Sequence, residues 1–485
     1  MDDPILVIDA GTTSTRAMLF GLDGACHGVA QRPLSQHYPR PGWVEHDAEE
    51  IWRESLACAG AMLAKVPRVA ALGITNQRET IVFWHRRTHR ALAPAIVWQD
   101  RRTAAMCAKL AEQGAESLVQ ARTGLVLDPY FSASKIAWAL DHWPQLRDAG
   151  ADLCVGTVES WLIFQLTGGL HVTDATNASR TALMDIGRGR WDDELLALWG
   201  VPGAILPEIV DCAGPIGTTS ADHFGPIVPI TGVAGDQQAA AIGQSCLAPG
   251  DTKATYGTGA FILANTGDAP RPSAHRLLST VAWQLEGVRS YAMEGSVFVA
   301  GALVKWLRDE LGLLAAAAES DAVARSVEDC GGVHIVPAHS GLGAPHWRAD
   351  ARGLIAGLSL STGRAHIVRA ALEAMAHQTH DLMTAFAADG AAWQVLRIDG
   401  GMASNDWLAQ DLADVLGLEV ERPANVETTA LGAAMLAAVG RGHFADLHEA
   451  AAMRGPVERF APAMDAAVRE RRLAGWKSAL AAALR

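Results

Sequence analysis

The stretch GVAGDQQAAAIG, residues 232–243, sets one acidic side chain between an apolar strand and a helix of small residues. Residues 229–235 predict a buried strand that ends in glycine, and the alanines after Gln237 predict a closely packed helix. Asp236 falls at the junction, beside the free N–H groups of the helix N-terminus. An aspartate at this position is often only a helix cap. Whether Asp236 is a cap or a functional carboxylate therefore depends on the rest of the chain.

Length and composition indicate a two-domain globular protein. The 485 residues exceed one ordinary core, so we expect two domains, residues 1–244 and 245–485. Hydrophobic residues make up 49% of the chain and charged residues 19%, which excludes a disordered chain. The net charge is −13 and no long basic run is present. These features argue against nucleic acid and anionic membrane surfaces as partners.

Cysteine usage and the N-terminal residues predict a cytoplasmic protein. The seven cysteines are scattered without a CxxC pair, which argues against a disulfide framework or a zinc site and favours reduced thiols. The opening residues MDDP are acidic, unlike a signal peptide, and no apolar run reaches about 18 residues. We therefore expect no membrane insertion.

Two segments, one in each half, predict a β-hairpin with a glycine-containing polar tip. Residues 5–20 form the first, and residues 251–265, with a Gly-Thr-Gly tip, form the second. Plain turns also favour Gly and Thr. The first hairpin carries more polar groups than a turn requires: Asp9, Thr12, Thr13, Ser14 and Arg16. Two similar hairpins suggest two related domains that hold a polyphosphate between them, although neither is a P-loop or a GxGxxG motif.

A third nucleotide candidate lies in residues 395–417, which predict a strand, a Gly-Gly turn and an amphipathic helix. Gly400 and Gly401 would let a base or ribose approach the backbone, and Asn405 at the helix start offers an amide. The same pattern is a common connection in α/β proteins.

A polyol-binding candidate follows the buried strand predicted before Asn76. Arg78 and Glu79 are adjacent, and from a turn they can converge to offer donors and acceptors to a polyol. The alternative is an exposed hairpin tip with solvated charges. Trp98 and Tyr130 are candidate walls of a site, although aromatic residues more often lie in a core.

Two other patterns are interpreted as structural or coincidental. Glu373, His377 and Asp381, with His380 beside them, have helical spacing and resemble a metal-ligand set, but the same helix has its own apolar stripe. We therefore interpret them as its solvated face. The run SASK, residues 132–135, fits the SxxK pattern of acyl-serine enzymes, but no SDN or KTG accompanies it.

Eight runs follow one another along the chain: DAGTTSTRA (9–17), GITNQRET (73–80), AIVWQDRRT (95–103), TGLVLDPYFSASK (123–135), HVTDATNASRT (171–181), GVAGDQQAA (232–240), TYGTGAF (255–261) and GLGAPHW (341–347). In this order they closely resemble the FGGY family of carbohydrate kinases. The match spans nearly the whole chain and includes a family-type segment from Gly353 through Gly357 to His366 and Glu373. GITNQRET, DPYFS and GDQQAA point to the branch that acts on glycerol.

The resemblance implies an α/β fold of two actin-like (ribonuclease H-like) domains with a catalytic cleft between them. Residues 1–244 would be the N-terminal FGGY domain, which binds glycerol and carries the first phosphate hairpin; residues 245–485 would be the C-terminal, nucleotide-binding FGGY domain. The implied activity is Mg²⁺-dependent transfer from ATP to glycerol, giving sn-glycerol 3-phosphate in glycerol catabolism. By analogy with the family, we expect a homo-oligomer, a dimer or tetramer.

The resemblance also assigns residues to roles. Asp236 would be the base that takes the proton from the attacking hydroxyl, and Arg78 and Glu79 would bind the other hydroxyls. The remaining substrate contacts would be Tyr130, Gln237, Trp98 and Phe261, the last two as apolar walls. The nucleotide contacts would be Thr12, Thr13, Ser14, Arg16, Thr258, Gly301, Lys305, Gly401 and Asn405. Mg²⁺ would lie near Asp9 and Asp236.

The chain departs from the family pattern at several positions. Ala10 and Lys305 replace glutamines, Glu159 stands where Asp is usual, and Ala139 replaces a larger apolar residue. Residues 220–227 lack the basic groups of a fructose 1,6-bisphosphate loop, and Val468 replaces a zinc-binding glutamate of the transport-regulator site. We therefore expect both controls to be absent. His223 resembles, with shifted spacing, a phosphorylated histidine of another branch, but a loop histidine is usually only solvated.

Two alternatives remain. A kinase of the same family could act on another polyol or a ketose, and only the Arg78, Glu79 and Trp98 pocket argues against it. An actin-like filament or nucleotide-switch protein would need the cleft but not the triol ligands. Glycerol-dependent formation of ADP separates these hypotheses.

Overall fold

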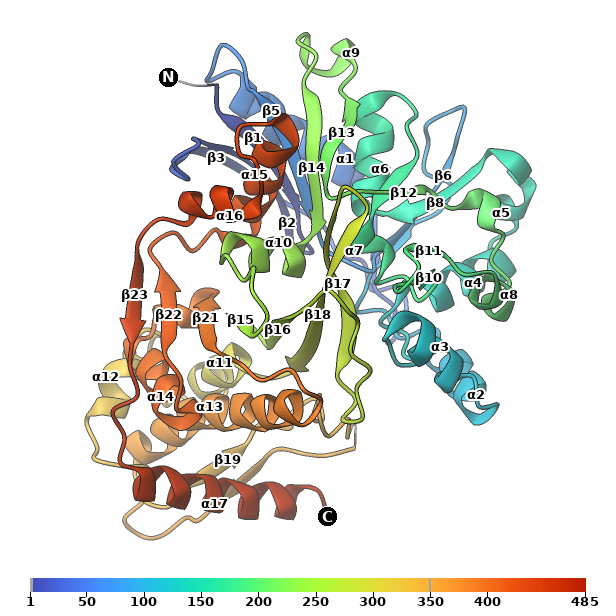
Figure 1. Cartoon of the computed structure of the whole chain (residues 1–485). Helices are drawn as coiled ribbons and strands as arrows, with labels where there is room; N and C mark the ends of the chain where they lie inside the picture. The colour runs from blue at the N-terminus through green and yellow to red at the C-terminus, as the bar shows by residue number, and fades with distance from the viewer. Residues whose placement is uncertain (1–2, 349) are drawn as a thin grey trace.

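The computed structural model describes residues 3–348 and 350–485 of the chain, which fold around two large mixed β-sheets. The first contains, in order, β13 (Ala213–Thr218), β14 (Pro229–Gly235), β5 (Ala71–Asn76), β1 (Ile5–Ala10), β2 (Ser14–Phe20) and β3 (Cys26–Pro33). The second contains β17 (Leu278–Leu285), β18 (Val288–Val297), β16 (Ala260–Gly267), β15 (Asp251–Tyr256), β21 (Val395–Asp399), β22 (Val420–Pro423) and β23 (Val457–Phe460). Figure 1 shows them in the upper and lower parts of the molecule.

The two sheets have the same internal plan. In the first, β1 pairs antiparallel with β2, which pairs antiparallel with β3, while β1, β5 and β14 run parallel and β13 closes the edge antiparallel. In the second, β15 pairs antiparallel with β16 and β16 with β18, while β15, β21 and β22 run parallel and β23 closes the edge antiparallel. The prediction of two hairpins in two related halves is therefore confirmed, and each hairpin is the first pair of its sheet.

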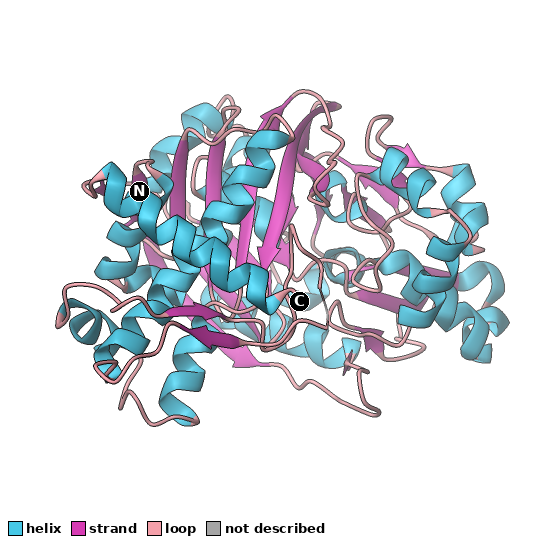
Figure 2. Cartoon of the chain, turned by 90° about the horizontal axis from the view of Figure 1, so that it is seen from below, coloured by secondary structure: helices cyan, strands magenta, loops and turns pink. Residues whose placement is uncertain are grey.

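Helices cover both faces of the sheets, as Figure 2 shows. The principal helices are α1 (Ala48–Leu63), α4 (Ser132–His142), α6 (Val158–Thr167), α7 (Ala175–Ala178), α10 (Asp236–Gly243), α11 (Gly301–Asp309), α12 (Glu319–Arg325), α13 (Arg364–Ala388), α14 (Asp406–Leu416), α15 (Thr428–Arg441) and α17 (Ala466–Ala483). The other helices are α2 (Ala104–Glu112), α3 (Glu116–Thr123), α5 (Pro144–Asp148), α8 (Asp193–Trp199), α9 (Ala221–Phe224) and α16 (Leu447–Ala450).

The remaining elements are small. A four-stranded sheet contains β4 (Glu45–His46), β7 (Ala95–Ile96), β6 (Ile81–His85) and β8 (Leu153–Thr157). Three two-stranded sheets pair β10 (Met184–Asp185) with β11 (Arg190–Trp191), β9 (Val172–Asp174) with β12 (Glu208–Val210), and β19 (His334–Val336) with β20 (Leu354–Ala356). Short 3₁₀ turns are η1 (Gly150–Asp152), η2 (Gly203–Ile205), η3 (Gly401–Ser404) and η4 (Ala451–Arg454).

Strand β1 is buried on both faces. Leu6 and Ile8 pack in a core formed with α1 and α6, whereas Ile5 and Val7 pack in a core formed with α10 and α15. Because successive side chains of a strand point to opposite faces, a continuous apolar run such as ILVI fits a strand covered on both sides.

Helix α15 lies between β22 and β23 of the second sheet in sequence but packs against the first sheet. Figure 1 shows this red helix beside the blue strands of the N-terminal half. Small residues make the contact possible, since a Cβ on Gly73 would lie 2.5 Å from the carbonyl oxygen of Ala433. The division of the chain after residue 244 stays a prediction. Wherever the boundary lies, α15 of the C-terminal half covers one face of the N-terminal sheet.

Helices α10 and α15 cross with almost no space between their backbones, as the small residues of α10 predict. A Cβ added to Gly432 would lie 1.8 Å from the carbonyl oxygen of Ala239, and one added to Gly243 would lie 2.0 Å from that of Thr428. The predicted helix after Gln237 is thus confirmed, and its alanines and glycine form its contact surface.

We expect Gly432→Ala to lower the free energy of unfolding by about 1–3 kcal/mol, because the added methyl group forces the two helices apart. Gly60→Ala is the matched control, since no atom lies within 4 Å of its Cβ position in helix α1. That change should instead stabilise the protein by about 0.5–1 kcal/mol. Urea denaturation measures both, and equal midpoints for the two variants would contradict the close crossing.

The interpretation of Glu373, His377 and Asp381 as a solvated helix face is wrong for the first two. They lie on α13, and Glu373 and His377 are 2% and 1% exposed because α17 covers that side of the helix. Arg472 of α17 lies 3.4 Å from Glu373, and the ring of Trp476 stacks on His377. The polar face of α13 therefore packs against another helix, α17, instead of facing solvent. Within the described residues, no group of three or more His, Cys, Asp or Glu side chains has the arrangement of a metal site.

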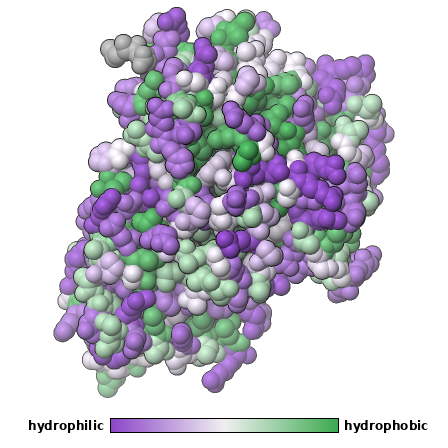
Figure 3. Space-filling view, viewed as in Figure 1, coloured by the Kyte–Doolittle hydropathy of each residue, from purple (hydrophilic) through white to green (hydrophobic). Residues whose placement is uncertain are grey.

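The surface in Figure 3 is predominantly hydrophilic, with hydrophobic residues in small groups. None of the helices in residues 3–348 and 350–485 combines the length and the apolar character needed to span a membrane. Each of the seven cysteines has a free thiol.

Candidate functional site

The polar candidates of the N-terminal half meet at the carboxyl-terminal edge of the first sheet. In the parallel strands, Asp9 of β1 lies opposite Thr75 of β5, and Asn76 at the end of β5 lies opposite Gly235 at the end of β14. The residues that follow these strands, Arg78 and Asp236, therefore emerge side by side. Ligands of open α/β sheets bind at this edge.

Asp236 is the first residue of α10 and occupies the junction between the two sheets. Its Oδ1 accepts a hydrogen bond of 2.7 Å from the backbone N–H of Gln237 and lies 3.3 Å from Nε of Arg78. Burial raises the pKa of Asp236 to about 6, because it disfavours the charged carboxylate more than the positive charge of Arg78 stabilises it. The side chain keeps 32% of its surface exposed, so the carboxylate is accessible. The helix N-terminus thus orients Asp236 without enclosing it.

Arg78 and Glu79 are buried, so the alternative of a solvated hairpin tip is wrong. Both side chains are 2% exposed. Arg78 donates to both oxygens of Glu294 at 2.7 and 3.2 Å, and Arg180 donates to Oε1 of Glu79 at 2.7 Å. The turn that carries them adopts the left-handed conformation at Glu79, with φ of 62°. The sequence predicted the convergence of Arg78 and Glu79 but not their buried partners.

Arg180 and Glu294 are the site residues that sequence reasoning missed. Glu294 interrupts the otherwise apolar and small run YAMEG in strand β18, which is a signal that a buried charge is being held there. Arg180 lies in the run HVTDATNASRT, where the resemblance gave it no role.

Three half-buried aromatic rings lie together beside this cluster. The ring centroid of Trp98 is 5.6 Å from that of Tyr130 and 6.4 Å from that of Phe261, both in edge-to-face geometry. The hydroxyl of Tyr130 accepts from Arg78 at 3.5 Å, and the indole N–H of Trp98 donates to Oγ1 of Thr12 at 2.9 Å. The structure thus brings Trp98, Tyr130 and Phe261 together, although Phe261 comes from the second sheet.

The first hairpin presents its polar tip to the same region. Asp9 accepts a hydrogen bond from Arg16 at 2.5 Å. Arg16 also donates to Glu427, the residue before α15, at 2.5 Å. Burial raises the pKa of Asp9, although Arg16 opposes the shift. Thr13 at the tip is exposed, and Thr12 and Ser14 are half-buried. The hairpin therefore offers hydroxyls and one arginine at the contact between the halves.

A buried lysine of the second hairpin reaches the start of α10. Lys253 of β15 donates to Oε1 of Gln237 and, at 2.9 Å, to Oγ1 of Thr255. Burial lowers the pKa of Lys253, and Asp399 and Asp236 oppose the shift. This contact orients the amide of Gln237 from the second half of the chain.

The nucleotide candidates of the second half form a separate group. The backbone N–H of Ala300 donates to the carbonyl of Thr258 at 2.9 Å, and a Cβ on Gly301 would lie 3.1 Å from Cγ of Met402. The second hairpin, the start of α11 and the turn that begins at Gly401 therefore meet. Lys305 is exposed one turn along α11.

The amide of Asn405 is occupied within the protein. Its oxygen caps α14 by accepting from the N–H of Leu408 at 2.9 Å, and its nitrogen donates to Ser320 at 3.1 Å. This side chain holds the turn in place. Asn405 is 9% exposed, so little of it is accessible to a nucleotide.

Ser132 and Lys135 of the SASK run have separate structural contacts. Lys135 donates to the carbonyls of Pro129, Tyr130 and Phe131 at 2.5, 2.7 and 3.2 Å, and Ser132 donates to the carbonyl of Glu79 at 3.0 Å. Lys135 therefore fixes the turn that carries Tyr130, and Ser132 fixes the turn that carries Glu79.

His223 lies in α9 rather than in a solvated loop. Its Nε2 is 2.9 Å from the carbonyl oxygen of Gln165, and its ring packs edge-to-face on Trp52 at 5.0 Å. These contacts are those of a structural histidine.

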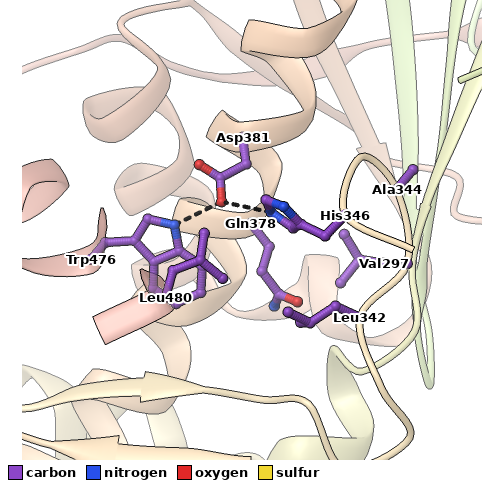
Figure 4. Close-up of a pocket in the computed structure, with 9 residues that line it drawn as sticks. Val297, Leu342, Ala344, His346, Gln378, Asp381, Trp476 and Leu480 are labelled. Carbon is purple, nitrogen blue, oxygen red and sulfur yellow. Dashed lines mark hydrogen bonds and ion pairs between the residues drawn. The ribbon is translucent and has the colours of Figure 1, made fainter. Parts of the chain in front are cut away.

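A small cavity lies away from this edge, between α13, α17 and the loop after β19 (Figure 4). Asp381 accepts from the indole N–H of Trp476 at 2.8 Å, and Nε2 of His346 lies 3.7 Å from the same carboxylate. The cavity has a volume of about 10 Å³. That volume holds about one water molecule and excludes a nucleotide or polyol.

Comparison with known proteins gives one consistent result. Residues 4–243 match the N-terminal domain of the FGGY family of carbohydrate kinases, and residues 252–441 match its C-terminal domain. The chain is 53% identical over 483 residues to glycerol kinase of Rhodospirillum centenum, covering 98% of this chain and 97% of the relative. It is 54% identical over 488 residues to glycerol kinase of Methylobacterium nodulans, covering 98% and 97%.

Solved structures agree. The crystal structure of Plasmodium falciparum glycerol kinase with ADP superposes with a TM-score of 0.95 at 34% identity, covering 99% of this chain and 98% of the other. A xylulose kinase from Brucella ovis has the same fold, with a TM-score of 0.89 at 24% identity, covering 98% of both chains.

Proposed function

Because the chain belongs to the FGGY family of carbohydrate kinases, we propose that it transfers the γ-phosphoryl group of ATP to glycerol with Asp236 as the base. The activity is that of glycerol kinase, the name carried by full-length relatives more than half identical to it. The observation that carries the residue assignment is the accessible carboxylate of Asp236 held 3.3 Å from buried Arg78.

Glycerol fits the polar and apolar surfaces at this junction. Arg78 retains an Nε–H without a hydrogen-bond partner, and Glu79 has a second carboxylate oxygen to accept from a hydroxyl. The rings of Trp98 and Phe261 offer apolar faces to the carbon chain. We assign the contacts with the two non-reacting hydroxyls to Arg78 and Glu79, with Tyr130 and Gln237 beside them, and the contact with the reacting hydroxyl to Asp236.

The chemistry follows from this arrangement. The oxygen of the terminal hydroxyl attacks the γ-phosphorus, its proton passes to the carboxylate of Asp236, and the bond to the β-phosphate oxygen breaks to release ADP. The protein contributes mainly positioning and neutralisation of charge. Arg16 and the hydroxyls of Thr12, Thr13 and Ser14 bind phosphate oxygens from one side. Thr258, Gly301, Gly401 and Lys305 bind the nucleotide from the other side, and Asn405 holds the turn beside them.

The residues near the phosphate site fit Mg²⁺. This ion is usually held by one or two carboxylates together with phosphate oxygens and water, and Asp9 and Asp236 supply two carboxylates close enough to interact electrostatically. When bound, the ion neutralises charge on the transferred phosphoryl group. Asp9 is held for this role by its ion pair to Arg16.

We predict that kcat/KM for glycerol falls about tenfold per pH unit below about pH 6. Asp236 must be unprotonated to accept the hydroxyl proton, and its raised pKa of about 6 places the loss of activity there. The sign is that of a base: activity is present above this pKa and lost as the pH falls through it. Initial rates at saturating Mg-ATP between pH 5 and 8 measure it, and a flat profile down to pH 5 would contradict the role of Asp236.

Three further assignments follow from the family rather than from contacts within one chain: the oligomeric state, the location and the pathway. We expect an assembly of two or four chains in the cytoplasm, acting in glycerol catabolism. Sedimentation velocity of the purified protein tests the assembly, and a monomer at all concentrations would contradict it.

Release of ADP from Mg-ATP, compared for glycerol, erythritol, xylulose, ribulose and no acceptor, tests the substrate. We expect turnover on glycerol far above that on the others. Preferred turnover on a ketose or another polyol would keep the family and overturn the pocket assignment. Release that is independent of any acceptor would instead favour an actin-like nucleotide switch.

A further inference from the structure

Four buried charges form a closed ring beside the proposed glycerol site. Arg78 pairs with Glu294 at 2.7 Å, Glu294 with Arg180 at 3.0 Å, Arg180 with Glu79 at 2.7 Å, and Glu79 lies 3.8 Å from Arg78. Positive and negative groups alternate, so the ring is neutral. Each of the four side chains is at most 2% exposed. We call this group the four-charge ring.

The four-charge ring joins the two halves of the chain. Arg78 and Glu79 follow β5 of the first sheet, and Arg180 follows the short helix α7. Glu294 alone comes from the second sheet, from the middle of β18. The proposed ligands of the two non-reacting hydroxyls are therefore held by a carboxylate of the opposite half.

Glu294 determines which part of Arg78 faces the base. Both terminal nitrogens of Arg78 donate to Glu294, and Nη1 also reaches Oε1 of Gln238 at 3.2 Å. Only Nε is turned toward Asp236, at 3.3 Å, and it makes no hydrogen bond there. Without Glu294, the planar guanidinium is free to pair with Asp236 through two nitrogens, which would mask the base.

Arg180 has the corresponding effect on Glu79. The backbone of Glu79 has φ of 62°, a conformation that a residue with a side chain adopts only when its surroundings hold it. The hydrogen bond from Arg180 fixes the carboxylate at 2.7 Å, and Ser132 fixes the carbonyl at 3.0 Å. The guanidinium of Arg180 also lies 5.8 Å from the ring centroid of Tyr130.

Stability alone does not explain the four-charge ring, because burying ion pairs costs desolvation that their attraction barely offsets. Burial raises the pKa of Glu294, but Arg180 and Arg78 outweigh it and lower the value to about 2. The two arginines thus keep Glu294 ionised at neutral pH. A permanently charged anchor suits a positioning role.

We propose that Glu294 and Arg180 are positioning residues for glycerol, which hold Arg78 and Glu79 in their binding geometry and make that geometry depend on contact between the two halves. This proposal rests on the proposed function. It predicts that the affinity for glycerol is affected more strongly than the affinity for the nucleotide, although Glu294 belongs to the half that carries the nucleotide candidates.

The test measures KM for glycerol and for Mg-ATP in Glu294→Gln, Arg180→Lys and the double variant. We expect KM for glycerol to rise about tenfold or more in each single variant, with KM for Mg-ATP changed less than about twofold. Because the ring acts as a unit, the double variant should be little worse than the worse single variant. Unchanged KM for glycerol in folded Glu294→Gln, or equal increases in both KM values, would overturn the proposal.

Glu421→Gln is the matched control. Glu421 is also a buried glutamate of the second sheet, 5% exposed and bonded to Arg397 at 3.1 Å and Arg454 at 2.8 Å, but it contacts none of the four ring residues. We expect this variant to unfold at a lower temperature with KM for glycerol unchanged. A rise in KM equal to that of Glu294→Gln would show a general effect of instability and overturn the positioning role.

Two further results distinguish failure of this proposal from a folding defect of the variant and from failure of the proposed function. If Glu294→Gln does not fold, Glu294→Asp keeps the charge on a shorter side chain, and its KM for glycerol should still rise; an unchanged KM would overturn the proposal. Failure of the proposed function would appear earlier, as absence of glycerol phosphorylation by the unaltered protein.

Discussion

Replacing Asp236 by asparagine is expected to lower kcat with glycerol by about 10²–10⁴-fold, because the amide cannot accept the hydroxyl proton. The fold should be retained, since the amide oxygen of asparagine still accepts from the N–H of Gln237. Rates of ADP release at saturating glycerol and Mg-ATP measure the loss. The residual rate should also lose the dependence on pH near 6 that Asp236 confers.

Asp192→Asn provides the control for this prediction. Asp192 is another aspartate at the start of a helix, where it accepts from the N–H groups of Glu194 and Leu195 at 3.0 Å each, and it lies outside the proposed site. We expect kcat to be unchanged in this variant. A kcat for Asp236→Asn within about threefold of the unaltered protein would reduce Asp236 to a helix-terminal residue.

The second large effect concerns substrates that lack one hydroxyl. We expect kcat/KM for 1,2-propanediol and 1,3-propanediol to lie on the order of 10⁴-fold below that for glycerol, because each leaves a buried polar group of the site unpaired. The groups at stake are Arg78 and Glu79, whose side chains are 2% exposed and cannot turn to water instead. Initial rates with each diol over a range of concentrations measure this ratio.

Glu79→Gln tests the source of that discrimination. The substitution keeps the size of the side chain but removes its charge, so Arg180 loses a charged partner at 2.7 Å and the hydroxyl loses a strong acceptor. We expect kcat/KM for glycerol to fall toward the value for the diols, with the diols affected less. Equal losses for all three substrates would assign the discrimination to residues other than Glu79.

The local features of the site were predictable because each depends on a short run of sequence. Residues 232–243 indicated a strand that ends beside Asp236 and a helix of small residues, and β14 and α10 confirm both. The two polar hairpins indicated two related halves, and the matching strand order of the two sheets confirms them. Strand and helix periodicity, together with turn chemistry, are sufficient for such predictions.

Contacts between distant segments were not predictable in the same way. Glu294 meets Arg78 across 216 residues of sequence, and no local pattern specifies that pairing. Helix α15 covers the first sheet although it lies between β22 and β23 of the second sheet in sequence. Close packing of glycine and alanine leaves no periodic signal that would predict this partner. The polarity of Glu373 and His377 predicts a solvated face, because polarity alone does not reveal that α17 covers them.

The most direct test of the glycerol site is a crystal structure of the protein with glycerol and ADP. We predict that one terminal hydroxyl lies about 2.6–3.2 Å from the carboxylate of Asp236. The other hydroxyls should contact Arg78 and Glu79, with the carbon chain against Trp98. Glycerol bound away from Asp236, with the four-charge ring uncontacted, would contradict the assignment of this junction as the site of phosphoryl transfer.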